Sequence, residues 1–122
     1  MKKILIVEDE LAYSIIMHGQ LIANGYEVIE AGDGEAGFEL AKKEKPELIL
    51  LDLRMPKMDG MTLLSLIRKD EVLKNTKVII LTVLEIDKET LSHIIDTGLT
   101  SYCVKSDTTL EALLNKIKEM TS

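Results

Sequence analysis

The chain has 122 residues, a length that predicts one domain over residues 1–122. Its 15 Lys and Arg against 21 Asp and Glu give a formal net charge of −6, the wrong sign for direct binding of nucleic acid. A single cysteine, Cys103, cannot form an intramolecular disulfide, and no apolar run approaches the ~20 residues that cross a bilayer. We therefore expect a cytoplasmic protein without a membrane contact.

Five short apolar runs have the length of β-strands. They cover, in chain order, residues 4–7, 28–29, 48–51, 78–81 and 102–104. The first, third and fourth are continuously apolar, as is typical of parallel strands that are buried on both faces.

Five further segments carry apolar residues at helical spacing. They contain, in chain order, Leu11, Ile15 and Ile22; Ala36, Leu40 and Ala41; Leu63, Leu64 and Ile67; Leu91, Ile94 and Ile95; and Leu110, Leu113, Leu114 and Ile117. Strands that alternate with helices in this way predict an α/β fold, a three-layer, doubly wound sheet of five parallel strands.

Turn and cap residues agree with the helix boundaries. Gly25 stands where the first helix ends, and Asp33 and Asp59 precede the second and third helices as N-cap candidates. Thr108 and Glu111 have the capping-box spacing before the last helix.

Polar side chains follow the strands of the predicted sheet. Glu8 and Asp9 follow the first strand, Asp52 the third, Thr82 the fourth and Lys105 the fifth. Ligands of doubly wound sheets bind beyond the carboxyl ends of the strands, so we expect these five side chains to converge at one edge.

Three carboxylates at one edge repel one another, and a hard divalent cation bound by their oxygens is the simplest compensation. The expected cofactor is Mg²⁺, or Mn²⁺, and Lys105 and Thr82 could bind the same phosphate oxygens as this ion. Asp52 is the candidate nucleophile, because it ends the central strand and a carboxylate that attacks phosphorus forms an acyl phosphate.

Taken one by one, these residues also have ordinary interpretations. Asp52 could be a capping or solvated carboxylate, and Tyr102 a half-buried strand aromatic. His18 and His93 have no partner at metal-ligand spacing, so packing or solvent exposure is the interpretation for both. Cys103 lies in an apolar strand with no base near it in the sequence, so we expect a buried, inert thiol.

Several motifs together resemble the receiver domain of two-component response regulators. They are Glu8-Asp9, Leu50-Leu51-Asp52-Leu53-Arg54-Met55-Pro56 with Asp59-Gly60, Thr82, and Tyr102-Cys103-Val104-Lys105. The resemblance covers about residues 3–119. It implies a flavodoxin-like fold with strand order 2-1-3-4-5, and a stand-alone regulator of the chemotaxis or sporulation type.

The resemblance implies a role for each matching residue. Asp52 would be the phosphoacceptor, and the metal would be bound by Asp52, Asp9, Glu8 and the backbone carbonyl of Arg54. Lys105 would pair with the phosphoryl oxygens. Thr82 would hydrogen-bond one of these oxygens, and Tyr102 would change rotamer with Thr82 as part of the switch.

The resemblance also implies the partners. The donor would be a sensor histidine kinase or a phosphotransfer protein, and a downstream protein would bind the face made by the fourth helix, fifth strand and fifth helix. We expect a monomer or weak dimer that acts as a signalling switch, and no enzyme beyond its own phosphorylation and dephosphorylation.

Two residues depart from the family pattern. Val83 stands where a small residue usually follows the threonine, and it predicts slow hydrolysis and restricted use of small phosphodonors. Ser106 replaces the usual proline after Lys105. A cis bond before a residue other than proline costs about 3 to 4 kcal/mol, so we expect either a trans bond with an altered loop or local strain.

Three rival functions are open at this stage. A degenerate receiver could bind proteins without being phosphorylated. An aspartate-nucleophile phosphohydrolase is disfavoured because Arg54 stands where a second acid is expected. A flavin or nucleotide carrier would need a phosphate-binding loop after the first strand, where residues 7–10 are instead acidic.

Overall fold

The structure of the protein is a computed structural model that describes residues 1–53, 58–83, 89 and 99–122. Its elements in chain order are β1 (Lys3–Val7), α1 (Leu11–Ala23), β2 (Glu27–Ala31), α2 (Gly34–Glu44), β3 (Leu48–Asp52), α3 (Gly60–Lys69), β4 (Lys77–Thr82), β5 (Thr100–Val104) and α5 (Leu110–Thr121). The predicted helix around Leu91, Ile94 and Ile95 falls outside the described residues.

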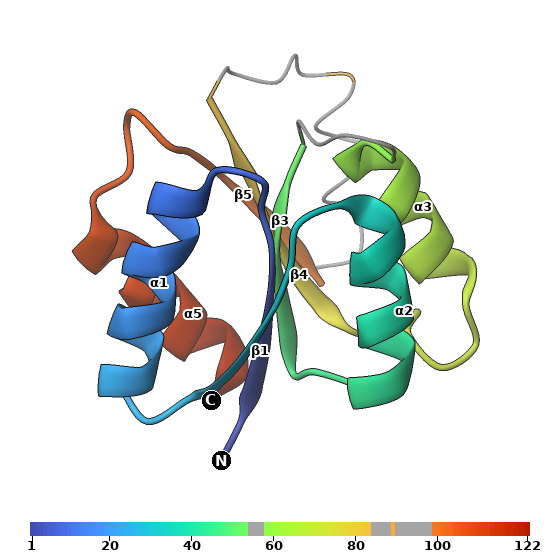
Figure 1. Ribbon diagram of the computed structural model, residues 1–122, viewed down its shortest axis with the longest axis horizontal. Coiled ribbons are helices and arrows are strands. Elements are labelled where there is room, and N and C mark those ends of the chain that lie inside the picture. The colour runs from blue at the N-terminus through green and yellow to red at the C-terminus, as the bar shows by residue number, and fades with distance from the viewer. Residues whose placement is uncertain (54–57, 84–88, 90–98) are drawn as a thin grey trace.

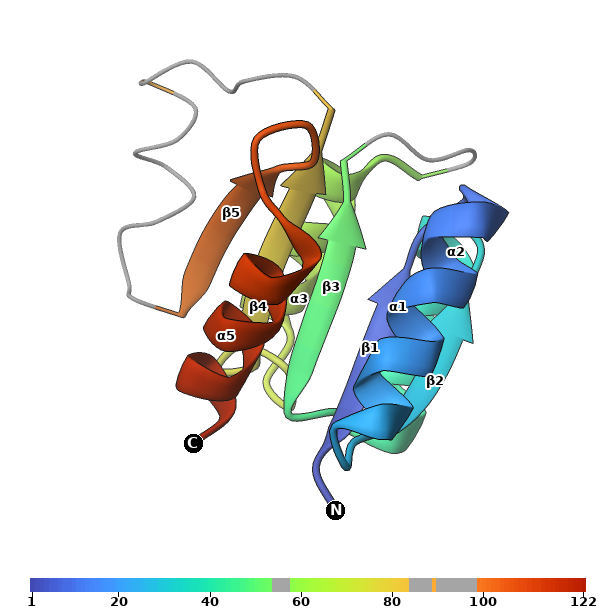
Figure 2. The same cartoon turned by 90° about the vertical axis from the view of Figure 1, so that its left-hand side faces the viewer.

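The five strands form one parallel sheet in the order β2-β1-β3-β4-β5. Helices α1 and α5 cover one face of this sheet, and α2 and α3 cover the other (Figure 1). Figure 2 looks onto the face covered by α1 and α5, with the carboxyl ends of the strands together at one edge. The predicted doubly wound α/β fold and its strand order are confirmed.

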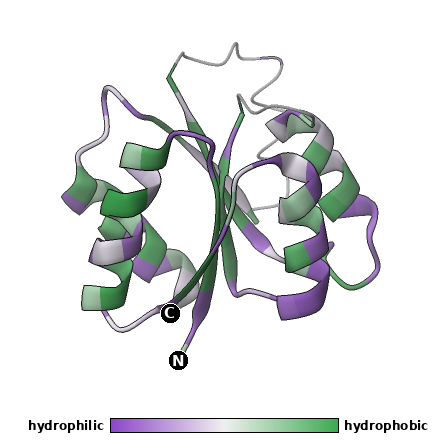
Figure 3. Ribbon diagram, in the orientation of Figure 1, coloured by the Kyte–Doolittle hydropathy of each residue, from purple (hydrophilic) through white to green (hydrophobic). Residues whose placement is uncertain are grey.

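The sheet has a separate hydrophobic cluster on each face. Residues of β1, β3 and β4 alternate between the two clusters, which explains why these strands are continuously apolar. Figure 3 shows this hydrophobic interior between the two helical layers. No helix in the described part of the chain is both long and apolar enough to cross a bilayer.

Helix α1 forms where it is predicted, but the apolar residues that marked it do not face the sheet. Leu11, Ile15 and Ile22 are 73%, 60% and 50% exposed. Met17 and Leu21 are instead fully buried against the cluster that contains strand residues of β1 and β3. The helix therefore has apolar residues on two sides, and spacing alone did not distinguish them.

The predicted helix caps are confirmed with one correction. Asp33 Oδ1 accepts a hydrogen bond from the backbone N–H of Ala36 at 2.9 Å. Asp59 Oδ1 accepts one from the backbone N–H of Thr62 at 2.8 Å. Gly25 has a φ of 88° directly after the α1 cap, a conformation that favours glycine. The prediction of Thr108 as the cap of α5 is wrong by one residue, because Thr109 Oγ1 accepts the hydrogen bond from Ala112 N at 3.1 Å.

Candidate functional site

Three acidic residues lie together at the carboxyl ends of β1 and β3. The register of these strands pairs Val7 with Leu51, so that Glu8 and Asp52 come next to each other at the edge of the sheet. Carboxylate oxygens of Glu8, Asp9 and Asp52 all lie within 4.8 Å of one another. Glu8 and Asp52 are only 4% and 6% exposed, whereas Asp9 is exposed. The cluster is therefore open to solvent on the side of Asp9.

Lys105 reaches this cluster from the end of β5. Its Nζ lies 2.8 Å from Glu8 Oε2 and 3.8 Å from Asp52 Oδ2, and its side chain is 10% exposed. The backbone N–H of Lys105 donates to the carbonyl of Thr82 at 2.7 Å. This bond fixes the base of the lysine side chain against the end of β4, from where the ammonium extends toward β1 and β3.

The electrostatics of the cluster favour the neutral form of Glu8. Burial raises the pKa of Glu8 from 4.5 to about 7, the hydrogen bond from Lys105 opposes this shift, and the neighbouring Asp52 adds to it. The backbone N–H of Glu10 also donates to Glu8 Oε1 at 3.1 Å, which favours the charged form. A cation bound by these oxygens would offset both the burial and the repulsion.

The donor set of the cluster fits a hard divalent cation. Two oxygens that each lie 2.0–2.1 Å from Mg²⁺ are at most about 4.2 Å apart, which is close to the observed limit of 4.8 Å between these carboxylate oxygens. All three side chains offer carboxylate oxygens, the ligand type that Mg²⁺ prefers. The further ligand expected from the Arg54 carbonyl falls outside the described residues.

Thr82 and Tyr102 lie on neighbouring strands at the same edge. The register pairs Ile80 with Tyr102 and Thr82 with Val104, so Thr82 and Tyr102 are diagonal neighbours on one face of the sheet. Thr82 is buried, and Tyr102 is partly buried against the cluster on the side of α2 and α3. The two residues of the predicted switch are therefore within side-chain reach.

The start of α3 is packed tightly against the end of β3. The N–H of Gly60 donates to the carbonyl of Leu53 at 3.0 Å. A Cβ at Gly60 would lie 2.6 Å from the Asp52 carbonyl oxygen and 2.7 Å from Leu53 Cα, both backbone atoms. Only glycine fits this close approach, which holds the backbone that follows Asp52.

One residue at the site has no counterpart among the predicted ones. The ring of Tyr13, on the first turn of α1, lies 4.3 Å from Lys105 Nζ, measured to the ring centroid. Tyr13 is partly buried against the cluster on the side of α1 and α5. The signal that could have identified Tyr13 is an aromatic residue four positions after Asp9, in the first turn of the helix that follows the acidic pair.

Ser106 and Val83 lie at the ends of β5 and β4. The described residues contain no cis peptide bond, so the bond between Lys105 and Ser106 is trans, one of the two predicted outcomes. The chain turns there, with the N–H of Asp107 donating to the carbonyl of Val104 at 3.0 Å. Val83 is 44% exposed, directly after the buried Thr82.

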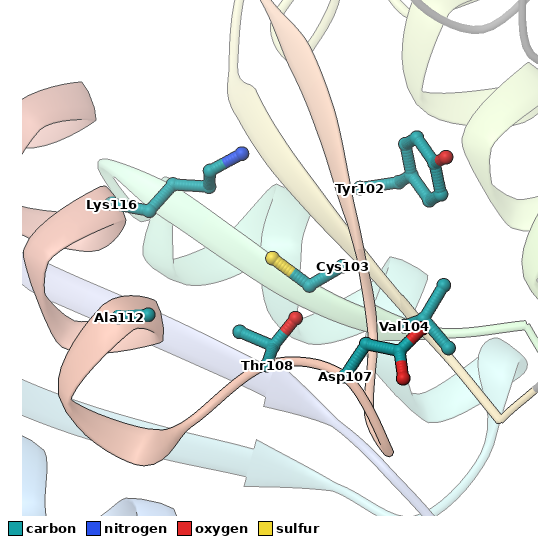
Figure 4. A pocket seen from close by; sticks show the side chains of 7 residues that line it. All are labelled: Tyr102, Cys103, Val104, Asp107, Thr108, Ala112 and Lys116. Carbon is teal, nitrogen blue, oxygen red and sulfur yellow. The ribbon is translucent and has the colours of Figure 1, made fainter.

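A shallow cleft of about 450 Å³ lies between β5 and α5, away from the acidic cluster. Figure 4 shows Cys103 and Tyr102 projecting to opposite sides of β5, with Cys103 toward α5. The Cys103 thiol is buried, as predicted. The cleft lies on β5 and α5, two of the three elements of the face predicted to bind a downstream protein. The third element, the predicted fourth helix, falls outside the described residues.

The sequence matches the response regulator receiver domain over residues 4–118. It is 35% identical, over 95% of this chain and 48% of the relative, to the probable transcriptional regulator ycf27 of Porphyridium aerugineum. The chain spans about half the length of the curated relatives it matches.

Solved structures give the same result. The CheY-like receiver domain protein from Methanospirillum hungatei is 30% identical with a TM-score of 0.87, covering 99% of this chain and 94% of that one. The chemotaxis response regulator CheY4 of Vibrio cholerae is 29% identical with a TM-score of 0.86, covering 98% of each chain. The chain thus belongs to the receiver domains of two-component response regulators.

Proposed function

We propose that Asp52 accepts a phosphoryl group from the phosphohistidine of a sensor histidine kinase or phosphotransfer protein. The observation that carries this proposal is the position of the buried Asp52 between two further carboxylates and the ammonium of Lys105. A nucleophilic carboxylate needs such surroundings, because its attack brings an anion onto an anionic phosphoryl group.

In this reaction an oxygen of Asp52 attacks phosphorus. The new O–P bond forms as the P–N bond to the donor imidazole breaks, and the imidazole nitrogen keeps the electron pair of the broken bond. Lys105 balances the charge on the transferred oxygens from its place near Asp52. Mg²⁺, or Mn²⁺, held by Glu8, Asp9 and Asp52 would neutralise further charge on the phosphoryl group.

The phosphoryl group would then change the surface of the domain. Thr82, from the end of β4, would hydrogen-bond one phosphoryl oxygen, and Tyr102 would change rotamer with it. Their diagonal arrangement across β4 and β5 supports this coupling. The downstream protein would bind at β5 and α5 together with the segment expected to form the fourth helix, and phosphorylation would shift the population of the binding state.

The rival functions have less support. A degenerate receiver would not need three carboxylates and a lysine in one cluster. We also propose that the domain is not a phosphohydrolase of other substrates, and that the acyl phosphate it hydrolyses is its own. We propose that the domain acts in the cytoplasm as a monomer or weak dimer. Its net charge of −6 disfavours direct binding of nucleic acid.

The experiment is phosphotransfer from a panel of autophosphorylated histidine kinases of the same genome. The parent chain should take the label from at least one kinase in the presence of Mg²⁺, and Asp52→Asn should take none. Asp107→Asn is the matched control, because Asp107 is an exposed aspartate at the same end of the sheet. Equal labelling of parent and Asp52→Asn would contradict the proposal.

A further inference from the structure

Lys105 has an aromatic neighbour as well as two acidic ones. Its Nζ lies 4.3 Å from the centroid of the Tyr13 ring, inside the ~6 Å range of a cation–π interaction. Glu8 and Asp52 contact the same ammonium at 2.8 Å and 3.8 Å. Because the Lys105 side chain is only 10% exposed, water screens this arrangement little.

We propose that Tyr13 is a positioning residue for phosphoryl transfer, which holds the Lys105 ammonium beside Asp52 through the face of its ring. This inference rests on the proposed function of Asp52 and adds a residue that acts on it through Lys105.

The lysine needs such a support because its acidic partners compete for it. Its shorter contact is with Glu8, which is also a candidate metal ligand. A cation bound by Glu8 would weaken that contact and repel the ammonium, and the flexible lysine stem would then be free to turn toward solvent. The Tyr13 ring is no metal ligand, so its attraction for Lys105 would persist.

The ring acts as a neutral group. Burial raises the pKa of Tyr13 to about 12, and the negative charge of Glu8 adds to this shift. The phenol therefore stays protonated at neutral pH, and the ring face attracts Lys105 through its quadrupole. Phenylalanine has the same ring face and should replace Tyr13, whereas leucine, of similar hydrophobic character, should not.

Helix α1 positions the ring through its first turn. The N–H of Ser14 donates to the Glu10 carbonyl at 3.1 Å, and the N–H of Glu10 donates to Glu8 Oε1 at 3.1 Å. One short segment, residues 8–13, thus supplies both the carboxylate and the ring that contact Lys105. A change at Tyr13 should act on Lys105 without removing any member of the acidic cluster.

The contact is tested first by a double-mutant cycle on stability. Tyr13→Leu, Lys105→Met and the double variant are unfolded in urea without metal. The two changes should be non-additive, with a coupling of about three- to tenfold in the folding equilibrium constant. If Tyr13→Leu does not fold, Tyr13→Met takes its place. Additive effects would overturn the inference.

The role is tested by labelling rate, with the kinase that labels the parent chain fastest and saturating Mg²⁺. Tyr13→Leu should be labelled about three- to tenfold more slowly, and Tyr13→Phe within about twofold of the parent. In the Lys105→Met background, Tyr13→Leu should have no further effect. Labelling of Tyr13→Leu at the parent rate, or of Tyr13→Phe as slowly as Tyr13→Leu, would overturn the inference.

Tyr26→Leu is the matched control. Tyr26 follows the far end of α1, and its hydroxyl hydrogen-bonds Thr121 Oγ1 at 2.9 Å. Its loss should lower stability and leave the labelling rate unchanged, which separates positioning from general destabilisation. A parent chain that no kinase labels would instead contradict the proposed function, and the role of Tyr13 with it.

Discussion

The ammonium of Lys105 lies closer to Glu8 than to Asp52, at 2.8 Å against 3.8 Å. The residue that would neutralise the incoming phosphoryl group is thus paired with a candidate metal ligand. A cation that binds Glu8 would loosen this pair and leave Lys105 available at Asp52. If Asp52 is the acceptor, metal binding and its activation would thus be coupled through one carboxylate.

The stability of the domain should depend on pH through Glu8. Its pKa in the fold, about 7, lies above the ordinary 4.5, so its stabilising contribution is complete below about pH 4.5 and is lost as the pH rises through about 7. Mg²⁺ binds the charged form and should therefore raise the melting temperature more at about pH 8 than at about pH 6. Thermal denaturation with and without millimolar Mg²⁺ measures both effects.

Glu8→Gln is the control for this dependence. Glutamine does not titrate, so the metal-free variant should lose the fall in melting temperature between about pH 5 and about pH 8. A parent chain whose melting temperature does not respond to millimolar Mg²⁺ at either pH would contradict the metal site.

Lys105→Ala should separate metal binding from phosphorylation. The variant keeps all three carboxylates and should still bind Mg²⁺. Its labelling rate should fall by roughly ten- to a hundredfold, because this factor corresponds to the free energy of one hydrogen bond to a charged group. Lys116→Ala is the matched control, because Lys116 donates to Ser101 Oγ at 2.8 Å and lies outside the acidic cluster. Equal labelling of the two alanine variants would contradict the role of Lys105.

Val83→Ala should open access to Asp52. Val83 follows the buried Thr82 at the end of β4 and is 44% exposed, and we predict that its branched side chain narrows access to Asp52. The alanine variant should be labelled severalfold faster by acetyl phosphate and should lose the label severalfold faster. Rapid labelling and rapid loss in the parent chain itself would show that Val83 does not restrict the site.

Gly60→Ala should destabilise the fold by about 1–3 kcal/mol, because its Cβ would overlap the Asp52 carbonyl oxygen and Leu53 Cα. Gly19→Ala is the matched control, with nothing within 4 Å of the added Cβ and a helical position that favours alanine by up to about 1 kcal/mol. Urea unfolding should thus give a lower free energy of unfolding for Gly60→Ala and a higher one for Gly19→Ala than for the parent. A Gly60→Ala variant as stable as the parent would rule out the close packing of α3 on β3.

Sequence patterns predicted the strands and the convergence of the acidic residues, and the resemblance to receiver domains supplied the strand order. Continuous burial makes β1, β3 and β4 apolar throughout, and the carboxyl ends of parallel strands meet at one edge. The exposed face of α1 was not predictable, because Ile15 and Met17 are equally apolar and only packing on the sheet distinguishes them. The contact of Tyr13 with Lys105 was missed for a similar reason, since it depends on how the Lys105 side chain extends from the end of β5 to the first turn of α1.

The most direct test of the account is to locate the phosphoryl group by mass spectrometry after transfer from a histidine kinase. The account predicts one labelled residue, Asp52, and an Asp52→Asn variant that is unlabelled and at least as stable as the parent, because one repelling charge has been removed. A label on any other residue, or a folded Asp52→Asn variant labelled at the parent rate, would contradict it.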